Sequence, residues 1–453
     1  MEADAVVVGL GPGGEQVAEE LASAGVDVVG IEAELVGGEC PYWGCVPSKM
    51  IVRAADVLAE GRRIAGLAGT SVVTPDWGPV ARRIRDEASD SWDDTVAVER
   101  LEGKGGRFVR GRARVVAPDA VVVNGERVTA RRALVLATGQ RAFVPPLFDA
   151  VPHWTNREAV AVETLPASLL VIGGGAIGLE LGQAMARFGT SVTIVETAER
   201  LVAHEEPEAS ELIADVLGRE GVDVHTGATV ERVEAFGSTG ATVHLEGGPA
   251  LRAERMLVAT GRRSDLAGLG VGALGLDEGA PAIPVDGRMR VAPGVWAVGD
   301  VTGKGAFTHV AAYQARLCAA DILGHPLPEA DYRALPRVTF TDPEIGSVGL
   351  TELQARANGA VEIYSEPIPE SARGWIHRGE GLVKLVVQEG QLVGATSVGP
   401  SGGEVLGLLA LALHARVPVD TIRGMIFAYP TFHRAVESAL WSSPRKAAKI
   451  DGA

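Results

Sequence analysis

The sequence predicts an α/β fold, because it contains two copies of a strand, a glycine-rich turn, a helix and a second strand in that order. Residues 4–9 (DAVVVG) and 168–173 (SLLVIG) are short apolar runs of the kind that form buried parallel strands. Each run leads into a glycine-rich turn and then into a helical stretch. The chain has 453 residues, which suggests roughly two to four domains. We therefore expect each copy to belong to its own domain.

The overall composition restricts the kind of protein that the chain can form. Its formal net charge is −16 and is spread along the chain, which disfavours nucleic acid and anionic membranes as partners. No apolar run approaches the ~18–20 residues of a membrane span, and residues 1–10 lack the features of a secretory signal. Three cysteines are too few for a disulfide framework. We expect a cytoplasmic protein in which a close pair of cysteines is catalytic or binds a metal.

The first glycine turn has the spacing G-x-G-x-x-G at Gly9, Gly11 and Gly14. In such a turn the first glycine permits the tight bend, the second lets the backbone approach a pyrophosphate, and the third lets helix and strand pack closely. The following helix directs free N–H groups at the phosphates. The next apolar run, 26–32, ends in Glu32, whose carboxylate suits a ribose diol. This stretch therefore predicts a dinucleotide site.

The second glycine turn repeats the pattern at Gly173, Gly175 and Gly178, and its second strand ends in Glu196. The same roles follow for the three glycines and the acid. Two dinucleotide sites in one chain indicate two cofactors that exchange electrons. We predict one tightly bound flavin, FAD, and one exchangeable nicotinamide.

The residue at position 196 also predicts which nicotinamide is used. The carboxylate of Glu196 would repel the 2′-phosphate of NADPH, so the sequence favours NADH over NADPH. Arg187 and Arg200 lie nearby in the sequence and weigh against this preference.

Three further stretches place candidate cofactor-binding residues at strand ends. Residues 133–139 (ALVLATG) and 256–263 (MLVATGRR) each end an apolar run in a small-residue turn, where the chain can pass close to a cofactor. In residues 294–301 (GVWAVGDV) an acid follows an apolar run, and its carboxylate suits a sugar or ribityl hydroxyl. An ordinary turn acid is the alternative at that position. The candidate residues in these turns are Thr138, Gly139, Gly261 and Asp300.

Residues 37–49, GGECPYWGCVPSK, hold two of the three cysteines, Cys40 and Cys45. A disulfide needs Cα atoms within about 7 Å, whereas five residues of helix rise ~7.5 Å along the axis. The two cysteines can therefore pair only if 41–44 form an irregular loop. The residues that follow are typical of a helix, which places Cys45 near a helix N-terminus, where a thiolate is stabilised. No other cysteine or histidine stands at a zinc-ligand spacing, so we predict no metal site.

These residues together resemble the flavoprotein disulfide reductases, the pyridine nucleotide–disulfide oxidoreductase family that includes dihydrolipoamide dehydrogenase, glutathione reductase and mercuric reductase. The resemblance runs end to end, and its most specific part is the motif G-G-x-C-x4-C-x-P-[ST]-K at 37–49. It implies two Rossmann-like dinucleotide-binding domains followed by an α+β C-terminal dimerisation domain. Residues 336–352 and 381–400 are similar to the family's C-terminal domain.

The resemblance also implies domain boundaries and an oligomer. The FAD-binding domain would be discontinuous, at 1–150 and 270–332, with the NAD(P)-binding domain inserted at 151–269. The interface domain would occupy 333–453. In the family this domain forms a homodimer in which the active site is shared between the two subunits.

Roles for four residues follow from the resemblance. Cys45 would face the flavin as the charge-transfer thiolate, and Cys40 would attack an incoming disulfide. Lys49 would lie beneath the flavin as both a catalytic and a cofactor-binding residue, and Glu180 would pair with it. This pairing also has a physical reason, because a buried lysine needs a carboxylate partner. Without the resemblance, Glu180 would be taken for an ordinary helix glutamate.

The C-terminal segment departs from the family pattern. Disulfide-reducing members carry H-P-T-x-x-E, in which the histidine is the acid–base group for the thiols. This chain has Tyr429 in place of the histidine and Arg434 in place of the glutamate. A tyrosine of pKa near 10 is a poor proton acceptor at neutral pH. His433, four residues on and one helical turn away, is either a substitute acid–base group or a histidine on a helix face.

Residues beside the cysteine pair also differ from the family pattern. Glu39 replaces a small hydroxyl residue and is expected to raise the pKa of Cys40 through like-charge repulsion. Tyr42 and Trp43 either line an apolar substrate site or pack the loop against the next domain. Cys318 lies in a helical apolar pattern and is expected in the core.

Three functions remain open at this point. The first, and the one we predict, is an NAD(P)H-dependent reductase that passes electrons through FAD to Cys40 and Cys45 and on to a disulfide or other thiol-reactive substrate, a small molecule or small thiol. The second is a flavin-only reductase of quinones or other electrophiles, with mercuric-reductase-like metal reduction as a further alternative. Mercuric reductases resemble this chain in having a tyrosine at the position that corresponds to Tyr429. They also carry a C-terminal cysteine pair, which has no counterpart in this sequence. The third is a non-catalytic redox sensor.

Overall fold

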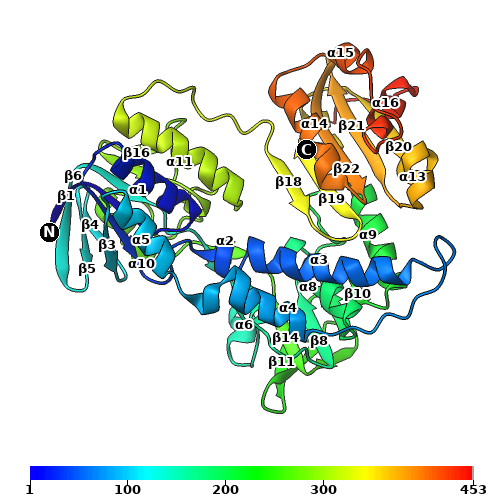
Figure 1. Cartoon of the computed structure of the whole chain (residues 1–453), viewed down its shortest axis with the longest axis horizontal. Coiled ribbons are helices and arrows are strands. Elements are labelled where there is room, and N and C mark those ends of the chain that lie inside the picture. Colours follow the sequence, from blue (N-terminus) through cyan, green and yellow to red (C-terminus); the bar gives the residue numbers. More distant parts are fainter. Residues whose placement is uncertain (451–453) are drawn as a thin grey trace.

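The computed structural model describes residues 1–450 and confirms the α/β class. The first sheet has eight strands, and β1 (Glu2–Val8) lies between β6 (Glu126–Leu136) and β2 (Val28–Glu32), parallel to both. β1 is mostly buried because its residues are apolar on both faces. Helices α1 (Pro12–Ser23) and α11 (Thr308–Leu323) pack together on this sheet (Figure 1). The other strands are β3 (Arg107–Arg110), β4 (Arg114–Ala117), β5 (Ala120–Val123), β16 (Arg290–Ala292) and β17 (Val295–Ala297).

The second sheet has four parallel strands and repeats the topology of the first around its own glycine turn. Its central strands β8 (Ser168–Ile172) and β9 (Ser191–Val195) flank the sequence of α8 (Ala176–Arg187). The sheet is completed by β10 (Asp223–His225) and β14 (Arg255–Val258), with α9 (Pro207–Arg219) before β10. A separate three-stranded antiparallel sheet comprises β11 (Val230–Phe236), β12 (Gly240–Leu245) and β13 (Ala250–Ala253).

The C-terminal part of the chain forms a six-stranded antiparallel sheet in the order β18-β19-β22-β21-β20-β23. Helix α14 (Gly402–His414) packs on β19 and β22, and its buried leucines fill the core of this part. The strands are β18 (Pro336–Thr339), β19 (Glu344–Gly349), β20 (Val361–Pro367), β21 (Leu382–Gln388), β22 (Gln391–Gly399) and β23 (Arg445–Ala447). The other helices are α12 (Glu352–Asn358), α13 (Ala372–His377), α15 (Val419–Arg423) and α16 (Arg434–Trp441).

Helix α3 (Cys45–Arg62) is the long element that crosses between these parts (Figure 1). Its buried residues are spaced four apart, at Pro47, Ile51, Ala55 and Ala59, so they form one stripe along the helix. This face packs against α8, and Ile51 and Ala55 share a hydrophobic core with the residues of α8. The N-terminus of α3 is therefore held between the two dinucleotide-type sheets.

Shorter elements connect the larger ones. The β7 and β15 strands form an antiparallel two-stranded ribbon. The connecting elements are β7 (Arg141–Ala142), β15 (Arg262–Arg263), α2 (Glu39–Tyr42), α4 (Gly78–Arg83), α5 (Thr95–Gly103), α6 (Pro146–Asp149), α7 (Asn156–Val160), α10 (Leu266–Leu269), and the short η1 (Ile84–Ala88), η2 (Asp90–Trp92), η3 (Val271–Leu274), η4 (Asp300–Thr302) and η5 (Ile368–Glu370).

Two expectations about burial and hydropathy can be compared directly with the fold. Cys318 lies on α11 with its side chain fully buried in the core, as predicted. Within residues 1–450, no helix is both long enough and apolar enough to cross a membrane. The predicted domain boundaries stay predictions, although β16 and β17 do join the first sheet from beyond the second.

Candidate redox active site

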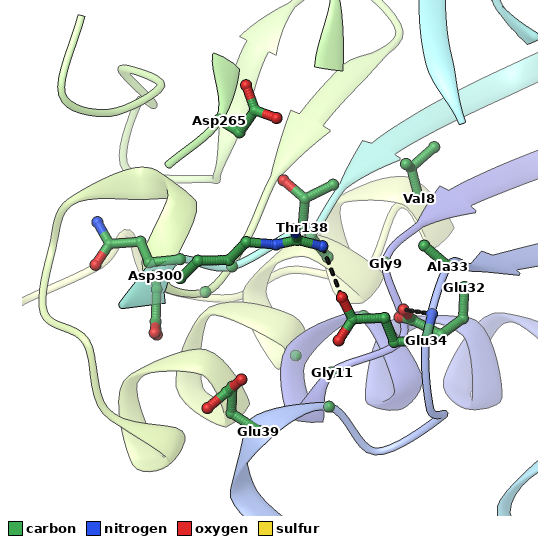
Figure 2. Close-up of a pocket in the computed structure, with 18 of the residues that line it drawn as sticks. Val8, Gly9, Gly11, Glu32, Ala33, Glu34, Glu39, Thr138, Asp265 and Asp300 are labelled. Carbon is green, nitrogen blue, oxygen red and sulfur yellow. Dashed lines mark hydrogen bonds and ion pairs between the residues drawn. The ribbon is translucent and has the colours of Figure 1, made fainter. Parts of the chain in front are cut away.

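One pocket gathers seven of the residues predicted to bind the flavin. It opens at the carboxyl ends of β1, β2 and β6, the edge at which parallel α/β sheets bind ligands. Figure 2 shows acidic side chains and the glycine turn around this pocket. The predicted residues that line it are Gly9, Gly11, Gly14, Glu32, Thr138, Gly139 and Asp300.

The glycines of the first turn have the backbone geometry that their spacing predicts. Gly9 has a φ of +90°, and a Cβ there would lie 2.5 Å from the carbonyl oxygen of Ala137. A Cβ at Gly14 would lie 1.9 Å from the carbonyl oxygen of Gly9. At Gly11 the nearest atom to such a Cβ is 4.0 Å away, on Gly38, so the backbone is open to the pocket. The turn therefore fits the pyrophosphate of a dinucleotide.

The acid at the end of β2 is fixed at the pocket by the main chain. One carboxylate oxygen of Glu32 accepts a hydrogen bond from the amide of Leu10 at 2.7 Å, and the other accepts one from the amide of Glu34 at 2.8 Å. Carboxylate oxygens retain further lone pairs for ligand hydroxyls. Glu32 can therefore hold the ribose of the adenosine half of FAD.

The second turn repeats this arrangement almost contact for contact. Gly173 has a φ of +113°, and a Cβ at Gly178 would lie 2.2 Å from its carbonyl oxygen. A Cβ at Gly175 would have no atom within 4 Å, so its backbone is open as at the first turn. Glu196 accepts hydrogen bonds from the amides of Gly174 and Ala198 at 2.6 and 2.7 Å. Of the other predicted residues, Gly261 lines a second pocket that shares Gln140, Arg262 and Arg263 with the first.

The two arginines near Glu196 in the sequence are occupied elsewhere. Arg187 is buried, and its guanidinium forms ion pairs with Asp56, Glu220 and Asp342. Arg200 donates hydrogen bonds to the hydroxyl of Ser210 and the carbonyl of Ala203. In this structure both arginines thus have partners other than the region around Glu196.

The cysteine pair lies where two helices meet. Cys40 is inside the four-residue helix α2, and Cys45 is the first residue of α3. The prediction of an irregular loop over 41–44 is only partly right, because 41 and 42 belong to α2 and only Trp43 and Gly44 interrupt the helical path. Both cysteines are free thiols in this structure.

The surroundings of the pair make its two thiols unequal. A hydrogen bond from the thiol of Cys40 lowers the pKa of Cys45 to about 5, and the hydroxyl of Thr308 and the charge of Lys49 add to this effect against partial desolvation. The pKa of Cys40 is raised well above its usual value, first by that same hydrogen bond and then by burial. The expected influence of Glu39 is not among the main causes. Cys45 is thus the thiolate of the pair, and Cys40 holds the proton.

Lys49 and Glu180 lie in contact, as their predicted pairing requires. The ammonium of Lys49 is 2.6 Å from a carboxylate oxygen of Glu180, which is only 5% exposed. The other oxygen of Glu180 accepts a hydrogen bond from the amide of Phe340 at 2.9 Å. The ring of Phe340 lies 4.6 Å from the Lys49 ammonium. The α3–α8 contact therefore holds a cation one helical turn from Cys45.

Thr308 is a site residue that the sequence reasoning missed. Its hydroxyl oxygen lies 3.3 Å from the sulfur of Cys45, and it is the first residue of α11. The two residues are 263 positions apart, and only the fold brings α11 to the start of α3. The sequence carries no local signal for this contact.

The C-terminal segment presents Tyr429 to solvent. Its side chain is 69% exposed, and its ring lies 5.2 Å from the guanidinium of Arg434. Figure 1 places α16, which follows this segment, at the outer side of the C-terminal sheet and away from α2. His433 is the N-cap of α16, and the residues between it and Tyr429 are not helical. The prediction that His433 lies one helical turn from Tyr429 is therefore wrong.

The two aromatic residues beside the cysteine pair differ, because Tyr42 packs inside the loop whereas Trp43 also lines the pocket at the first glycine turn. Tyr42 is buried, and its hydroxyl points at the carbonyl of Asp93 at 3.4 Å. Trp43 is half-buried, and the guanidinium of Arg157 lies over its ring at 4.1 Å. Packing is the interpretation that these contacts favour for Tyr42, whereas a role for Trp43 in lining a substrate site stays a prediction.

Comparisons with known proteins match the whole of this architecture. The family model described as pyridine nucleotide-disulphide oxidoreductase matches residues 3–315, and the model of that family's dimerisation domain matches 335–440. The chain is 34% identical to dihydrolipoyl dehydrogenase from Geobacillus stearothermophilus, over 97% of this chain and 96% of the relative. It is 32% identical to mercuric reductase from Bacillus cereus, over 99% of this chain and 72% of the relative.

Solved structures agree with the sequence comparisons. The Cu(II) complex of the HOCl-induced flavoprotein disulfide reductase RclA from Escherichia coli superposes with a TM-score of 0.85 at 26% identity, over 97% of this chain and 99% of that one. The resemblance seen in the glycine turns, the cysteine motif and the C-terminal sheet is thus a family relationship. The chain belongs to the pyridine nucleotide–disulphide oxidoreductase family, whose members are FAD-dependent oxidoreductases.

Proposed function

We propose that this protein is an NADH-dependent reductase that passes electrons through FAD to the Cys40–Cys45 pair and on to a disulfide or another thiol-reactive small molecule. The observation that carries the proposal is the state of Cys45. It begins α3 next to Cys40, and its pKa of about 5 makes it a thiolate at neutral pH. A thiolate at a helix N-terminus beside a second thiol is the arrangement that thiol–disulfide exchange requires.

Each part of the site has a role in this proposal. Bound FAD supplies two-electron exchange between the nicotinamide and the thiols. Gly11 and Glu32 bind its pyrophosphate and ribose, and Lys49, oriented by Glu180, provides positive charge beside Cys45. The hydrogen bond between the two thiols lets the proton of Cys40 pass to Cys45. Cys40 then attacks the substrate as a thiolate.

In the reaction with a disulfide substrate, the pair supplies both electrons and one proton, and solvent supplies the other proton. The sulfur of Cys40 bonds to one substrate sulfur, and the other leaves as a thiol. Cys45 then attacks Cys40, the mixed disulfide breaks, and the second thiol leaves. The two cysteines lose two electrons and the one proton that Cys40 carried, and the second proton that the substrate gains comes from solvent. The internal proton transfer supplies acid–base chemistry in a chain that has Tyr429 where the disulfide-reducing relatives have a histidine.

The nicotinamide is NADH in this proposal. Glu196 is held at the end of β9 by two main-chain amides, where its charge opposes a 2′-phosphate. Arg187 and Arg200, which could have bound that phosphate, have other partners. A comparison of kcat/KM for NADH and NADPH tests this point directly.

The working unit that we propose is a cytoplasmic homodimer. The dimerisation domain of the family spans most of the C-terminal sheet, and Tyr429 is exposed in the single chain. In the dimer, Tyr429 would meet the Cys45 region of the partner subunit, and His433 is a candidate acid–base group on the same segment. A tyrosine hydroxyl there can donate a hydrogen bond to the departing sulfur.

The two cysteine variants test the proposal. We expect Cys40→Ser and Cys45→Ser each to abolish NADH-dependent reduction of a disulfide such as 5,5′-dithiobis(2-nitrobenzoate). Cys318→Ala, which changes the buried third cysteine, is the matched control and should retain activity. Full activity in both serine variants would overturn the proposed electron path.

A second candidate is reduction of a soft metal ion or an electrophile such as a quinone. The relatives favour it, because mercuric reductase is among them and the RclA structure is a Cu(II) complex. The same variants separate the possibilities. Quinone reduction by the flavin alone survives both serine substitutions, whereas reduction of Hg(II) or Cu(II) through the pair is lost with them.

A further inference from the structure

We propose that Glu39, Asn156 and Arg157 form a clamp that holds Cys40 in position against Cys45. The proposal rests on the redox role of the pair proposed above. These three positioning residues come from the cysteine stretch and from α7, more than a hundred residues apart in the chain. The clamp would make the Cys40–Cys45 disulfide form more readily than two unconstrained thiols allow.

The helix that carries Cys40 cannot hold its own shape. α2 has four residues, whereas an isolated helix in water is marginal even at ~12–15 residues. Gly38 and Trp43, which flank it, have non-helical backbone angles, and neither end has a side-chain cap within α2 itself. Contacts from outside must therefore fix the position of Cys40.

The side-chain amide of Asn156 donates hydrogen bonds to both ends of α2. Its side-chain nitrogen donates a hydrogen bond to a carboxylate oxygen of Glu39 at 2.9 Å and another to the carbonyl oxygen of Trp43 at 2.8 Å. Glu39 is the first residue of α2 and Trp43 is its C-cap, so Cys40 lies between the two contacts. Asn156 is itself buried.

Arg157 closes the clamp from the other side. Its guanidinium donates to the second carboxylate oxygen of Glu39 at 2.8 Å and lies over the ring of Trp43 at 4.1 Å. It also pairs with Glu34, after β2, at 2.7 Å. Ionic hydrogen bonds and a stacked guanidinium both favour one geometry over others. Arg157 thus ties both ends of α2 to the strand end that bears Glu32.

The part of the chain that supplies the clamp is itself fixed. Thr155 and Glu158 form a capping box at the start of α7, with the amide of Thr155 donating to Glu158 at 2.7 Å. The segment carrying Asn156 and Arg157 is therefore anchored before it contacts α2. Arg262, whose guanidinium lies 3.7 Å from Glu39, adds positive charge at the same carboxylate.

The clamp explains why Glu39 does not determine the pKa of Cys40. A carboxylate on the residue next to a cysteine would ordinarily oppose formation of the thiolate. Here Arg157 is paired with that carboxylate and neutralises its charge. The consequence is geometric, because a held Cys40 has a high effective concentration toward Cys45.

The test is the redox equilibrium of the pair in the flavin-loaded protein. The protein is equilibrated with mixtures of oxidised and reduced glutathione, the free thiols are alkylated, and the Cys40–Cys45 disulfide is quantified by mass spectrometry. Each protein disulfide formed consumes one glutathione disulfide and releases two glutathione thiols. The ratio gives an equilibrium constant that is independent of turnover.

We expect Asn156→Ala and Arg157→Ala each to lower this equilibrium constant about tenfold, the effect of one hydrogen bond to a charged group. Glu39→Gln, which keeps an acceptor for Asn156 but loses the charge, should give a smaller decrease and serves if the alanine variants fail to fold. Arg157→Lys should restore part of the loss. Arg83→Ala, which removes an exposed arginine paired with Glu87, is the matched control.

The outcomes are separable. If melting temperature or flavin content falls while the equilibrium constant stays at the wild-type value, the three residues are only structural and the clamp is overturned. If the wild-type pair equilibrates as expected but the serine variants keep full turnover, the proposed function fails and the clamp stands. A wild-type constant in both Glu39→Gln and Asn156→Ala contradicts the clamp directly.

Discussion

The Cys45 region and the Tyr429 segment differ in how complete each is within one chain. Cys45 has Cys40, Thr308 and Lys49 around it, and Lys49 has a buried partner in Glu180. Tyr429 is 69% exposed, and the contact that its ring makes is with a neighbour on its own segment. One chain therefore provides all the groups that stabilise the Cys45 thiolate, whereas the Tyr429 segment is exposed and could contact a second subunit.

Removal of the Lys49 ammonium, which lies near Cys45, should have the largest effect on stability and on flavin reduction. Lys49→Met leaves the carboxylate of Glu180 buried and unpaired, so we expect a loss of about 2 kcal/mol in the free energy of unfolding, less than for a fully buried pair because Lys49 is partly exposed. Reduction of the flavin by NADH should slow about a hundredfold, as for other lost electrostatic groups. Stopped-flow absorbance and chemical denaturation measure the two effects. Lys446→Met, which changes an exposed lysine, should leave both unchanged.

Changing the exposed side should affect turnover without affecting stability. Tyr429→Ala should alter the free energy of unfolding by less than about 0.5 kcal/mol, as for other surface changes, and should leave flavin reduction by NADH intact. Reduction of the acceptor should fall about tenfold, because a hydrogen-bond donor is lost.

Mixed dimers sharpen this prediction. A dimer of one Tyr429→Ala subunit and one Cys45→Ser subunit contains one site with both wild-type residues, if each site draws on two subunits. Refolded mixtures should therefore reduce the acceptor faster than the average of the two variants measured alone. Mixtures no more active than the average of the two variants would show that Tyr429 does not cross the interface.

The pH dependence of the Cys45 thiolate is the third test. With a pKa of about 5, alkylation of the reduced protein by iodoacetamide should rise to half its maximum near pH 5. Thr308→Val removes a hydrogen-bond donor to the thiolate, so the midpoint should move to higher pH. Because the pKa is below the ordinary 9.0, the thiolate's contribution to stability is present above pH 9 and is lost as the pH falls toward 5. A midpoint near pH 9 in the wild-type protein would contradict the account.

The smallest expected effect is at Asp56, two helical turns along α3 from Lys49. Burial raises the pKa of Asp56 to about 6 against the attraction of Arg187, and Asp342 adds to the rise. A raised pKa means that stability is greatest below pH 3.8 and is lost as the pH rises through 6. Asp56→Asn should flatten this dependence, by less than about 1 kcal/mol because the group is partly exposed. If the melting temperature of Asp56→Asn depends on pH between 4 and 7 as steeply as that of the wild-type protein, Asp56 is not the group responsible.

The glycine turns show how far local sequence could predict the site. Gly9 and Gly173 were identified from spacing alone, because a turn without a Cβ is needed wherever strand, turn and helix follow in this order. Lys49 and Glu180 were paired only through the family resemblance, and the fold brings them to 2.6 Å. The sequence could therefore predict the features that depend on residue spacing within one segment, such as the glycine turns.

The missed residues share a different origin. Thr308 and Arg157 contact the cysteine stretch from 263 and 118 positions away, and such contacts exist only after the sheets have packed. His433 was placed on a helix that begins one residue later, because helix boundaries depend on capping by neighbours more than on composition. The ion pairs of Arg187 have the same origin, since its three acidic partners come from three separate segments.

The most direct measurement is an anaerobic titration of the purified protein with NADH, followed by visible absorption. The account predicts uptake of four electrons per flavin, with a long-wavelength band from the Cys45 thiolate beside the oxidised flavin after the first two. That result would establish Cys40 and Cys45 as a working redox pair. Complete bleaching of the flavin by two electrons, with no such band, would contradict the central claim and leave the cysteines outside the electron path.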